Sequence, residues 1–377
     1  IVRKIRLLIQ QIPLLSSTYY CNMRTRIPLL QLAVIPFFCR AFTPNYNYVS
    51  PIALQKNSML ASLPSLKQNV LRLKAVDVKV SDSELTGDDS AAFSLEEQNL
   101  SDWLKFSTAT GTVLALVAYV WFLPWGPHLG DSFLSTIQST LGTTSADVTV
   151  FAMLIFFAIC HSGLAGLRPY AEDIVGARAW RVVFAIVSLP LSLSCISYFI
   201  NHCHEGTQLW DLRSVPGLHA ACWMTDFVSF LLLYPSTFNL LEIAAIEKPQ
   251  LHLWETGVIR ITRHPQAIGQ IMWCVAHSAW LGTSTAVSAS SILILHHLYS
   301  VWHGDRRLKM KHGDAFEKIK ERTSVVPFKA IIEGRQELPY DYYTEFLRAP
   351  YALVVGGTLA AYFAHPYMMA GAALLHW

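Results

Sequence analysis

Charged side chains are scarce in this chain of 377 residues: Asp, Glu, Lys and Arg make up 15% of it. An ordinary soluble domain carries about 25%. Hydrophobic residues make up 53%, and the mean hydropathy is +0.34. This composition excludes a typical soluble globular protein and predicts a chain embedded in a membrane.

Several functional signatures are also missing. Residues 1–76 hold ten Lys and Arg and no Asp or Glu, which leaves 19 bases against 26 acids in residues 77–377. An acidic body disfavours nucleic-acid binding, which needs a basic face. The seven cysteines show no paired spacing that would indicate a disulfide scaffold. No internal repeat, Gly-rich phosphate loop or GxSxG elbow is found.

The basic, acid-free residues 1–76 are typical of a targeting leader. We take Met23 as its start, because the run Met23-Arg24-Thr25-Arg26 is a basic n-region and residues 27–39 are an apolar h-region of signal-peptide length. Cleavage is expected near Ala41-Phe42.

The second part of the leader, residues 43–76, has the composition of a plastid transit peptide. A Phe directly after the signal cleavage site indicates the bipartite leader of a secondary plastid. The alternatives are an ordinary signal anchor and a single-step mitochondrial or plastid leader. Residues 77–102 are rich in Asp and Glu and are predicted to form a flexible acidic linker.

Apolar runs close to the ~20 residues that cross the hydrocarbon core of a bilayer recur from Thr108 onward. They lie at residues 108–125, 148–167, 180–200, 218–241, 265–282, 288–303 and 350–375. The fifth and sixth runs are short, so six spans is the alternative to seven. The sequence therefore predicts an all-α fold, a polytopic transmembrane helix bundle of about seven spans.

The distribution of Lys and Arg supports seven crossings. Of the bases in residues 77–377, 18 would lie on one side of the membrane and only Arg213 on the other. Because the basic side is the cytosol-equivalent one, it would face the stroma of a plastid. Residues 304–349, the long polar segment before the last run, are predicted to form a loop with an amphipathic helix at the interface.

The second apolar run contains an imidazole, His161, two turns before Arg168. An ionisable group inside a span is costly, so it is a functional candidate by default. The small neighbours Ser162 and Gly163 would permit close approach of another helix or of a flat ligand. The alternative is a structural histidine bonded to a neighbouring helix.

In the fifth run, Cys274 and His277 stand three residues apart and share one face of the predicted helix. Imidazole and thiolate are the common protein ligands of haem iron. A lone CxxH is a weak signal, and it is not the CxxCH motif of covalent haem attachment.

The depths of His161 and His277 in the membrane indicate whether both could bind one iron. Counted along two antiparallel helices, His161 lies roughly 10 Å and His277 roughly 18 Å from the basic face. The difference of about 8 Å equals about five residues of helix rise, which helix tilt can absorb. The sequence therefore permits the pair without requiring it.

A third site is Arg263-His264-Pro265-Gln266, at the start of the fifth run. Pro suits the first helical turn, and the free amides there, together with Arg263, would favour an anion. The alternative is plain helix capping. His296, His297 and Asp226 are further polar groups in apolar runs and are interpreted as structural.

These motifs resemble those of a known family. Residues from about 103 to 377 resemble the 15-cis-zeta-carotene isomerases, plastid members of the NnrU-domain membrane proteins. The matching segments are residues 160–164 (CHSGL), 263–266 (RHPQ) and 273–278 (WCVAHS), in the same order and spacing.

The resemblance implies an isomerase that converts 9,15,9'-tri-cis-zeta-carotene to the 9,9'-di-cis isomer. It implies haem b as cofactor, with His161 and His277 as axial iron ligands and Cys274 as the alternate ligand in a redox-linked exchange that activates the reduced form. His264 belongs to a shared motif and is taken as cofactor-binding. The implied setting is a plastid membrane, with the carotenoid, lipid, an electron donor and other carotenoid-pathway enzymes as partners.

Two other interpretations stay open on sequence alone. The Arg-His-Pro run followed by a polar segment is also similar to membrane isoprenylcysteine methyltransferases and sterol reductases, where Arg263, His264 and Glu317 would hold S-adenosylmethionine or a related cofactor. The second is a non-enzymatic membrane haem protein that senses redox state.

Overall fold

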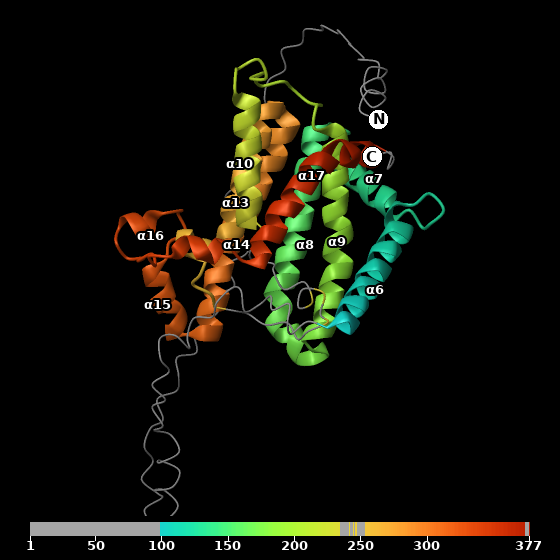
Figure 1. The fold of residues 1–377 in the computed structure, drawn as a ribbon. Helices are drawn as coiled ribbons and strands as arrows, with labels where there is room; N and C mark the ends of the chain where they lie inside the picture. The colour runs from blue at the N-terminus through green and yellow to red at the C-terminus, as the bar shows by residue number, and fades with distance from the viewer. Residues whose placement is uncertain (1–98, 234–240, 242–243, 245, 247–252, 374–376) are drawn as a thin grey trace, which may run out of the picture. The chain divides into compact units, whose positions relative to one another are not determined.

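The computed structural model describes residues 99–233, 241, 244, 246, 253–373 and 377, all within the compact unit Val78–Trp377. Every named element in these residues is a helix (Figure 1), and the β-type pairing there is one isolated bridge between Gln208 and Thr283. The predicted all-α class is confirmed.

In chain order the elements are α6 (Leu100–Val117), η2 (Ala118–Phe122), α7 (Leu129–Leu141), α8 (Ala146–Val175), α9 (Ala177–His202), α10 (Leu218–Leu233), α12 (Val258–Ile261), α13 (Pro265–Leu281), α14 (Ser284–His312), α15 (Asp314–Arg322), α16 (Lys329–Ile332), η4 (Tyr342–Phe346) and α17 (Ala349–Ala373). Each of the seven predicted apolar runs falls on one of the long helices. The predicted leader lies outside the described residues.

The start of α6 corrects the predicted linker of residues 77–102. The helix begins at Leu100, where the Asn99 side chain caps it by accepting from the backbone N–H of Asp102. Asp102 therefore lies in a first helical turn, where a negative charge suits the helix dipole, rather than in a flexible acidic segment. The rest of the linker lies outside the described residues.

A tight turn divides the fifth and sixth runs into two helices. Gly282 ends α13 with φ +65°, a left-handed conformation that favours glycine. The Thr283 side chain then accepts from the Ala286 N–H and caps α14. The predicted separation of these two runs is confirmed at the level of helices.

Residues 304–349, predicted to form a polar loop with an amphipathic helix, contain several helical segments. α14 continues to His312, and the rest holds α15, α16 and η4. α15 is amphipathic: its Phe316 and Ile319 are buried against Leu253 and Leu308. The helix part of the prediction is thus confirmed, and its placement at a membrane interface stays a prediction.

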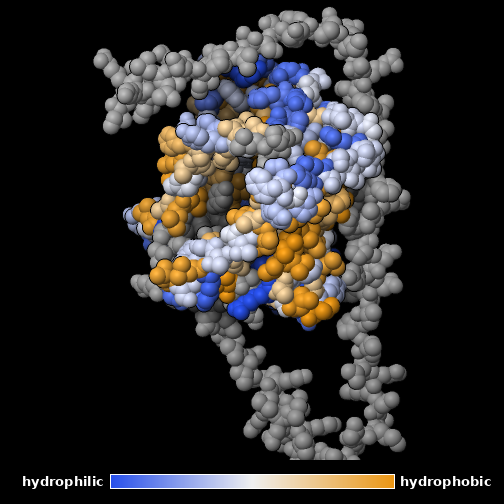
Figure 2. Space-filling view, turned by 90° about the vertical axis from the view of Figure 1, so that its right-hand side faces the viewer, coloured by the Kyte–Doolittle hydropathy of each residue, from blue (hydrophilic) through white to orange (hydrophobic). Residues whose placement is uncertain are grey.

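Three described helical segments are long and apolar enough to cross a membrane, namely Leu100–Phe122, Ala146–Val175 and Ala177–His202. α10 is apolar but shorter. Figure 2 shows broad hydrophobic patches on one side of the molecule, as expected of a surface that faces lipid. A membrane-embedded helical bundle is supported, and the count of about seven spans stays a prediction.

The long helices pack in a closed order. α10, α13, α14, α8 and α9 contact one another in that sequence, and α17 contacts both α9 and α10 (Figure 1). α17 therefore closes the row into a ring. Near one end of the ring, Val150, Met153, Tyr198 and Trp377 share a hydrophobic core.

The two ends of the bundle differ in charge. The segment with Arg213 joins α9 to α10 at the end where α13 turns into α14, and the α8–α9 turn, α12 and α15 lie at the opposite end (Figure 1). The other described Lys and Arg residues lie toward that opposite end. The fold thus agrees with the predicted one-sided distribution of bases.

Candidate functional site

His161 lies on α8 and is half-buried against α9 and α14. Its Nδ1 is 3.1 Å from the Oγ of Ser188 on α9. Its ring stands 4.8 Å from that of Phe184 and 5.6 Å from that of His296, centroid to centroid. The imidazole is therefore directed into the bundle.

The small residues beside His161 leave space. A Cβ added at Gly163 or Gly166 would meet no atom within 4 Å. Ser162 instead makes a hydrogen bond, with its Oγ 3.0 Å from the Nε2 of His296. Of the two predicted uses of this face, the close helix approach is not seen at the glycines.

His277 lies on α13 and has a defined tautomer. Its Nδ1 is 3.0 Å from the backbone carbonyl oxygen of Trp273, which can only accept, so Nδ1 carries the proton. The Asp226 carboxylate of α10 lies 3.6 Å from the same nitrogen. The Nε2 lone pair is left without a hydrogen bond among the described residues, the arrangement that a metal-binding imidazole adopts.

Cys274 is fully buried one turn before His277. Its Sγ accepts a hydrogen bond from the Gln270 side chain at 3.6 Å, and the Asp226 charge acts on its thiol. Cys274 and His277 therefore face the same part of the bundle, as their spacing predicts.

His161 and His277 lie at different levels. Ser162, next to His161, bonds His296, whereas Ser278, next to His277, bonds Ser290, also on α14. Six residues of α14 correspond to about 9 Å of helix rise, close to the offset expected from the sequence. One iron held by both imidazoles would need a ligand axis oblique to the helices.

The donor set fits a haem in its chemistry. Both imidazoles use Nδ1 in a hydrogen bond and leave Nε2 free in the described part of the chain. No group of three or more His, Cys, Asp and Glu in that part could hold a bare metal ion. Haem iron needs at most two protein ligands, so His161 and His277, with Cys274 as neighbour, are the residues that would hold it.

The third predicted site is already occupied by ion pairs. The His264 Nε2 is 2.6 Å from Asp305 on α14, and the Arg263 guanidinium reaches the same carboxylate at 2.9 Å. Burial alone would raise the pKa of Asp305, but the hydrogen bonds from His264 and Arg263 lower it to about 2. The Arg263 guanidinium is therefore paired within the protein, and its predicted contact with a separate anion stays a prediction.

Two further histidines lie close to the candidate ligands, and their positions were not predicted from the sequence. His296, interpreted as structural, is the ring neighbour of His161, and His365 on α17 acts electrostatically on His277. His365 stands inside the last apolar run, the same signal that singled out His161.

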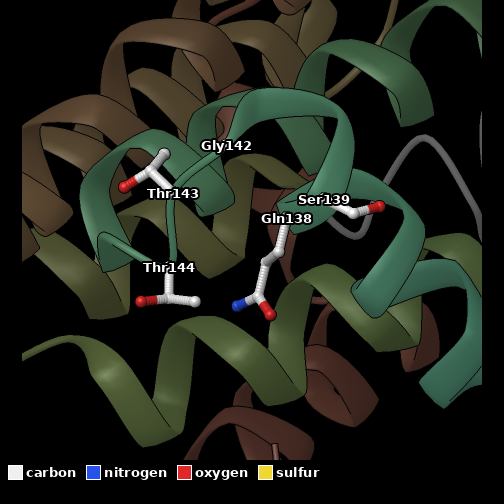
Figure 3. A pocket seen from close by; sticks show the side chains of 5 residues that line it. All are labelled: Gln138, Ser139, Gly142, Thr143 and Thr144. Carbon is white, nitrogen blue, oxygen red and sulfur yellow. The ribbon is translucent and has the colours of Figure 1, made fainter.

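A surface pocket lies at the α7–α8 turn, away from these residues. Gln138, Ser139, Gly142, Thr143 and Thr144 line it (Figure 3). Its walls are polar and hold no acid, base or metal ligand, so it is not a candidate site for chemistry on a hydrocarbon.

Comparison with known proteins gives concordant matches. The family model described as NnrU protein matches residues 149–372. A chloroplastic 15-cis-zeta-carotene isomerase of Arabidopsis thaliana is 52% identical over 303 residues, 80% of this chain and 82% of the relative. The chloroplastic enzyme of the same name from Zea mays is 51% identical over 293 residues, 78% of this chain and 79% of the relative. No solved structure matches.

Proposed function

The chain belongs to the 15-cis-zeta-carotene isomerases of the NnrU protein family, and we propose that it converts 9,15,9'-tri-cis-zeta-carotene to the 9,9'-di-cis isomer in a plastid membrane. The observation that carries this proposal is the identity to two isomerases over about four fifths of the chain. A bundle with broad apolar surfaces suits a hydrocarbon substrate dissolved in lipid.

The reaction requires the central 15–15' bond to lose its double-bond character for a moment, with no net redox change. A polyene offers no polar group that a side-chain acid could protonate or a side-chain base could deprotonate. His264 and Arg263 are committed as well, since both pair with Asp305. Acid–base catalysis by side chains is therefore a poor account of this chemistry.

We propose that haem b is the cofactor and that His161 and His277 would hold its iron. Bound haem would supply the electronic change at the central double bond, while the protein supplies ligation, orientation and a dry site. Ser188 and the Trp273 carbonyl fix the two rings through their Nδ1 atoms. The Asp226 carboxyl group lies 3.6 Å from the His277 Nδ1 and would help to orient the ring.

Cys274 is proposed as the alternate ligand. Its thiol lies on the same helix face as His277, three residues before it, and is shielded from water. Ligand identity sets the properties of haem iron, so the choice between His277 and Cys274, with reduction by an electron donor, would regulate the chemistry that a bound haem supplies.

Bacteria that accumulate the tri-cis substrate provide the test. Residues 77–377 are expressed there, and pigment isomers and the visible spectrum of the membranes are recorded. The His161→Ala and His277→Ala variants should lose haem and isomerisation by at least about tenfold, since even the outer partners of such ligands cost that much. His204→Ala, at an exposed imidazole between α9 and α10, is the matched control. Full haem content and full conversion in both ligand variants would exclude the haem proposal.

The two competing interpretations gain no support. Methyl transfer would use Arg263, His264 and Glu317, but these pair with Asp305 and Lys309. A purely redox-sensing role does not explain the kinship with isomerases. A methyltransferase would bind S-adenosylmethionine and lack a Soret band, which the same membranes would reveal.

A further inference from the structure

Three arginines from three helices meet at the basic end of the bundle. Arg168 of α8, Arg181 of α9 and Arg307 of α14 are each partly buried, and each lies within electrostatic range of the other two. The acid that acts on this group among the described residues is Glu172, 3.7 Å from the Nε of Arg168. The cluster therefore holds two positive charges in excess.

The guanidinium groups of these arginines have few hydrogen-bond acceptors. The Nε of Arg168 is buried without a hydrogen bond, and within the described part of the chain neither Arg181 nor Arg307 makes an ion pair or a hydrogen bond. Gathering like charges with unfilled donors is unfavourable unless another group completes them. Three guanidiniums arranged in this way suit an anion with several oxygens.

Apolar side chains flank the cluster on the outside of the same helices. Tyr170, Ile186 and Trp302 are at least half exposed, and the Arg168 guanidinium lies 6.0 Å from the ring of Phe184. Exposed aromatic and aliphatic residues beside a basic cluster shared by several helices are typical of a site for an anionic lipid at the membrane surface. A free anion would gain nothing from these apolar flanks.

We propose that Arg168, Arg181 and Arg307 bind the phosphodiester head group of an anionic membrane lipid, whose acyl chains lie along the outer faces of α8 and α9. The site goes beyond the isomerase reaction and does not depend on a haem. It would fasten three helices of the ring at the basic surface of the membrane.

The test uses the full chain, purified in neutral detergent and stripped of lipid. Phosphatidylglycerol is titrated in, and bound lipid is counted by native mass spectrometry. Wild type should hold one molecule per chain, and zwitterionic phosphatidylcholine should bind more weakly. The double variant Arg181→Gln/Arg307→Gln should weaken phosphatidylglycerol binding by at least about tenfold, the value expected for lost charge-assisted hydrogen bonds.

Two controls separate charge from folding. Arg213→Gln, at an arginine paired with Asp211 at the other end of the bundle, should bind like wild type. Arg181→Lys/Arg307→Lys keeps the charge and should retain most of the binding. Circular dichroism confirms that each variant is folded.

Three outcomes would overturn the proposal. The double Gln variant could bind the lipid as well as wild type does. Inorganic phosphate could displace the lipid at equal concentration, which would indicate a site for a free anion. Alternatively, the double variant could lose haem while its lipid binding is unchanged, which would assign the arginines to the carboxylates of the porphyrin.

Discussion

Asp305 and Asp226 are carboxyl groups in the bundle that differ in their partners. Asp305 is held by two cationic partners, Arg263 and His264. Asp226 has an imidazole 3.6 Å away, and its Oδ1 is buried without a hydrogen bond. The first arrangement joins the start of α13 to α14, and the second places a carboxyl group beside a proposed iron ligand.

The pairing of Asp305 predicts a pH dependence of stability. Its pKa falls from 3.8 to about 2 on folding, so the carboxylate favours the folded state above about pH 4, and this contribution disappears as the pH drops toward 2. Asp305→Asn should lower the free energy of unfolding by about 2 kcal/mol at neutral pH and remove this acid sensitivity. Thermal unfolding in detergent across this pH range measures it. Asp173→Asn, at an exposed carboxylate of α8, is the control, and an unchanged acid sensitivity in Asp305→Asn would contradict the assignment.

Asp226 should act through His277. Asp226→Asn keeps the shape of the side chain but replaces its carboxyl group with an amide, a weaker hydrogen-bond acceptor, so the imidazole should be held less well. We expect haem affinity to fall roughly 10-fold to 100-fold, with a shifted Soret band. Titration of haem into the purified apoprotein gives both readouts. Equal affinity and an unshifted spectrum would show that the carboxylate is merely structural.

At the scale of elements, the turns decide how the helices pair. Gly282 and Gly142 both end a helix at φ +65°, but their surroundings differ. A Cβ at Gly282 would overlap the backbone carbonyl of Trp210, whereas one at Gly142 would meet nothing within 4 Å. The α13–α14 turn is thus packed tightly against the α9–α10 connection.

These two glycines form a matched pair of variants. Gly142→Ala should lower the free energy of unfolding by about 1 kcal/mol, the cost of left-handed backbone for a residue with a Cβ. Gly282→Ala adds the overlap with Trp210, so its loss should reach at least about 2 kcal/mol. Chemical or thermal unfolding of both variants measures the difference. Equal losses would mean that the turn relaxes away from Trp210.

The apolar runs located the long helices because burial and lipid contact leave an unbroken hydrophobic signal. They missed α7, because its polar sequence carries little such signal although Phe133 and Ile137 pack on the core. The residue types of the site were also predicted from sequence. The contact between His161 and His296 was not predicted, because it depends on the order and rotation of the helices. Both come from packing between distant segments of the chain.

At the scale of the whole molecule, the charge asymmetry predicts sidedness. His204, in the connection after α9, and Tyr340, between α16 and η4, are both exposed. If the bundle crosses the membrane as its bases indicate, the two lie on opposite faces. In sealed vesicles of one orientation, an impermeant maleimide should label only one of His204→Cys and Tyr340→Cys before permeabilisation. Labelling of both in intact vesicles, above the background of the unsubstituted chain, would contradict the topology.

The closure of the ring by α17 sets an order of events during biosynthesis. α17 leaves the ribosome after the other five helices of the ring, so a lateral seam between α9 and α10 persists until α17 docks against both of them. The last helix to be made therefore completes the enclosure of the bundle.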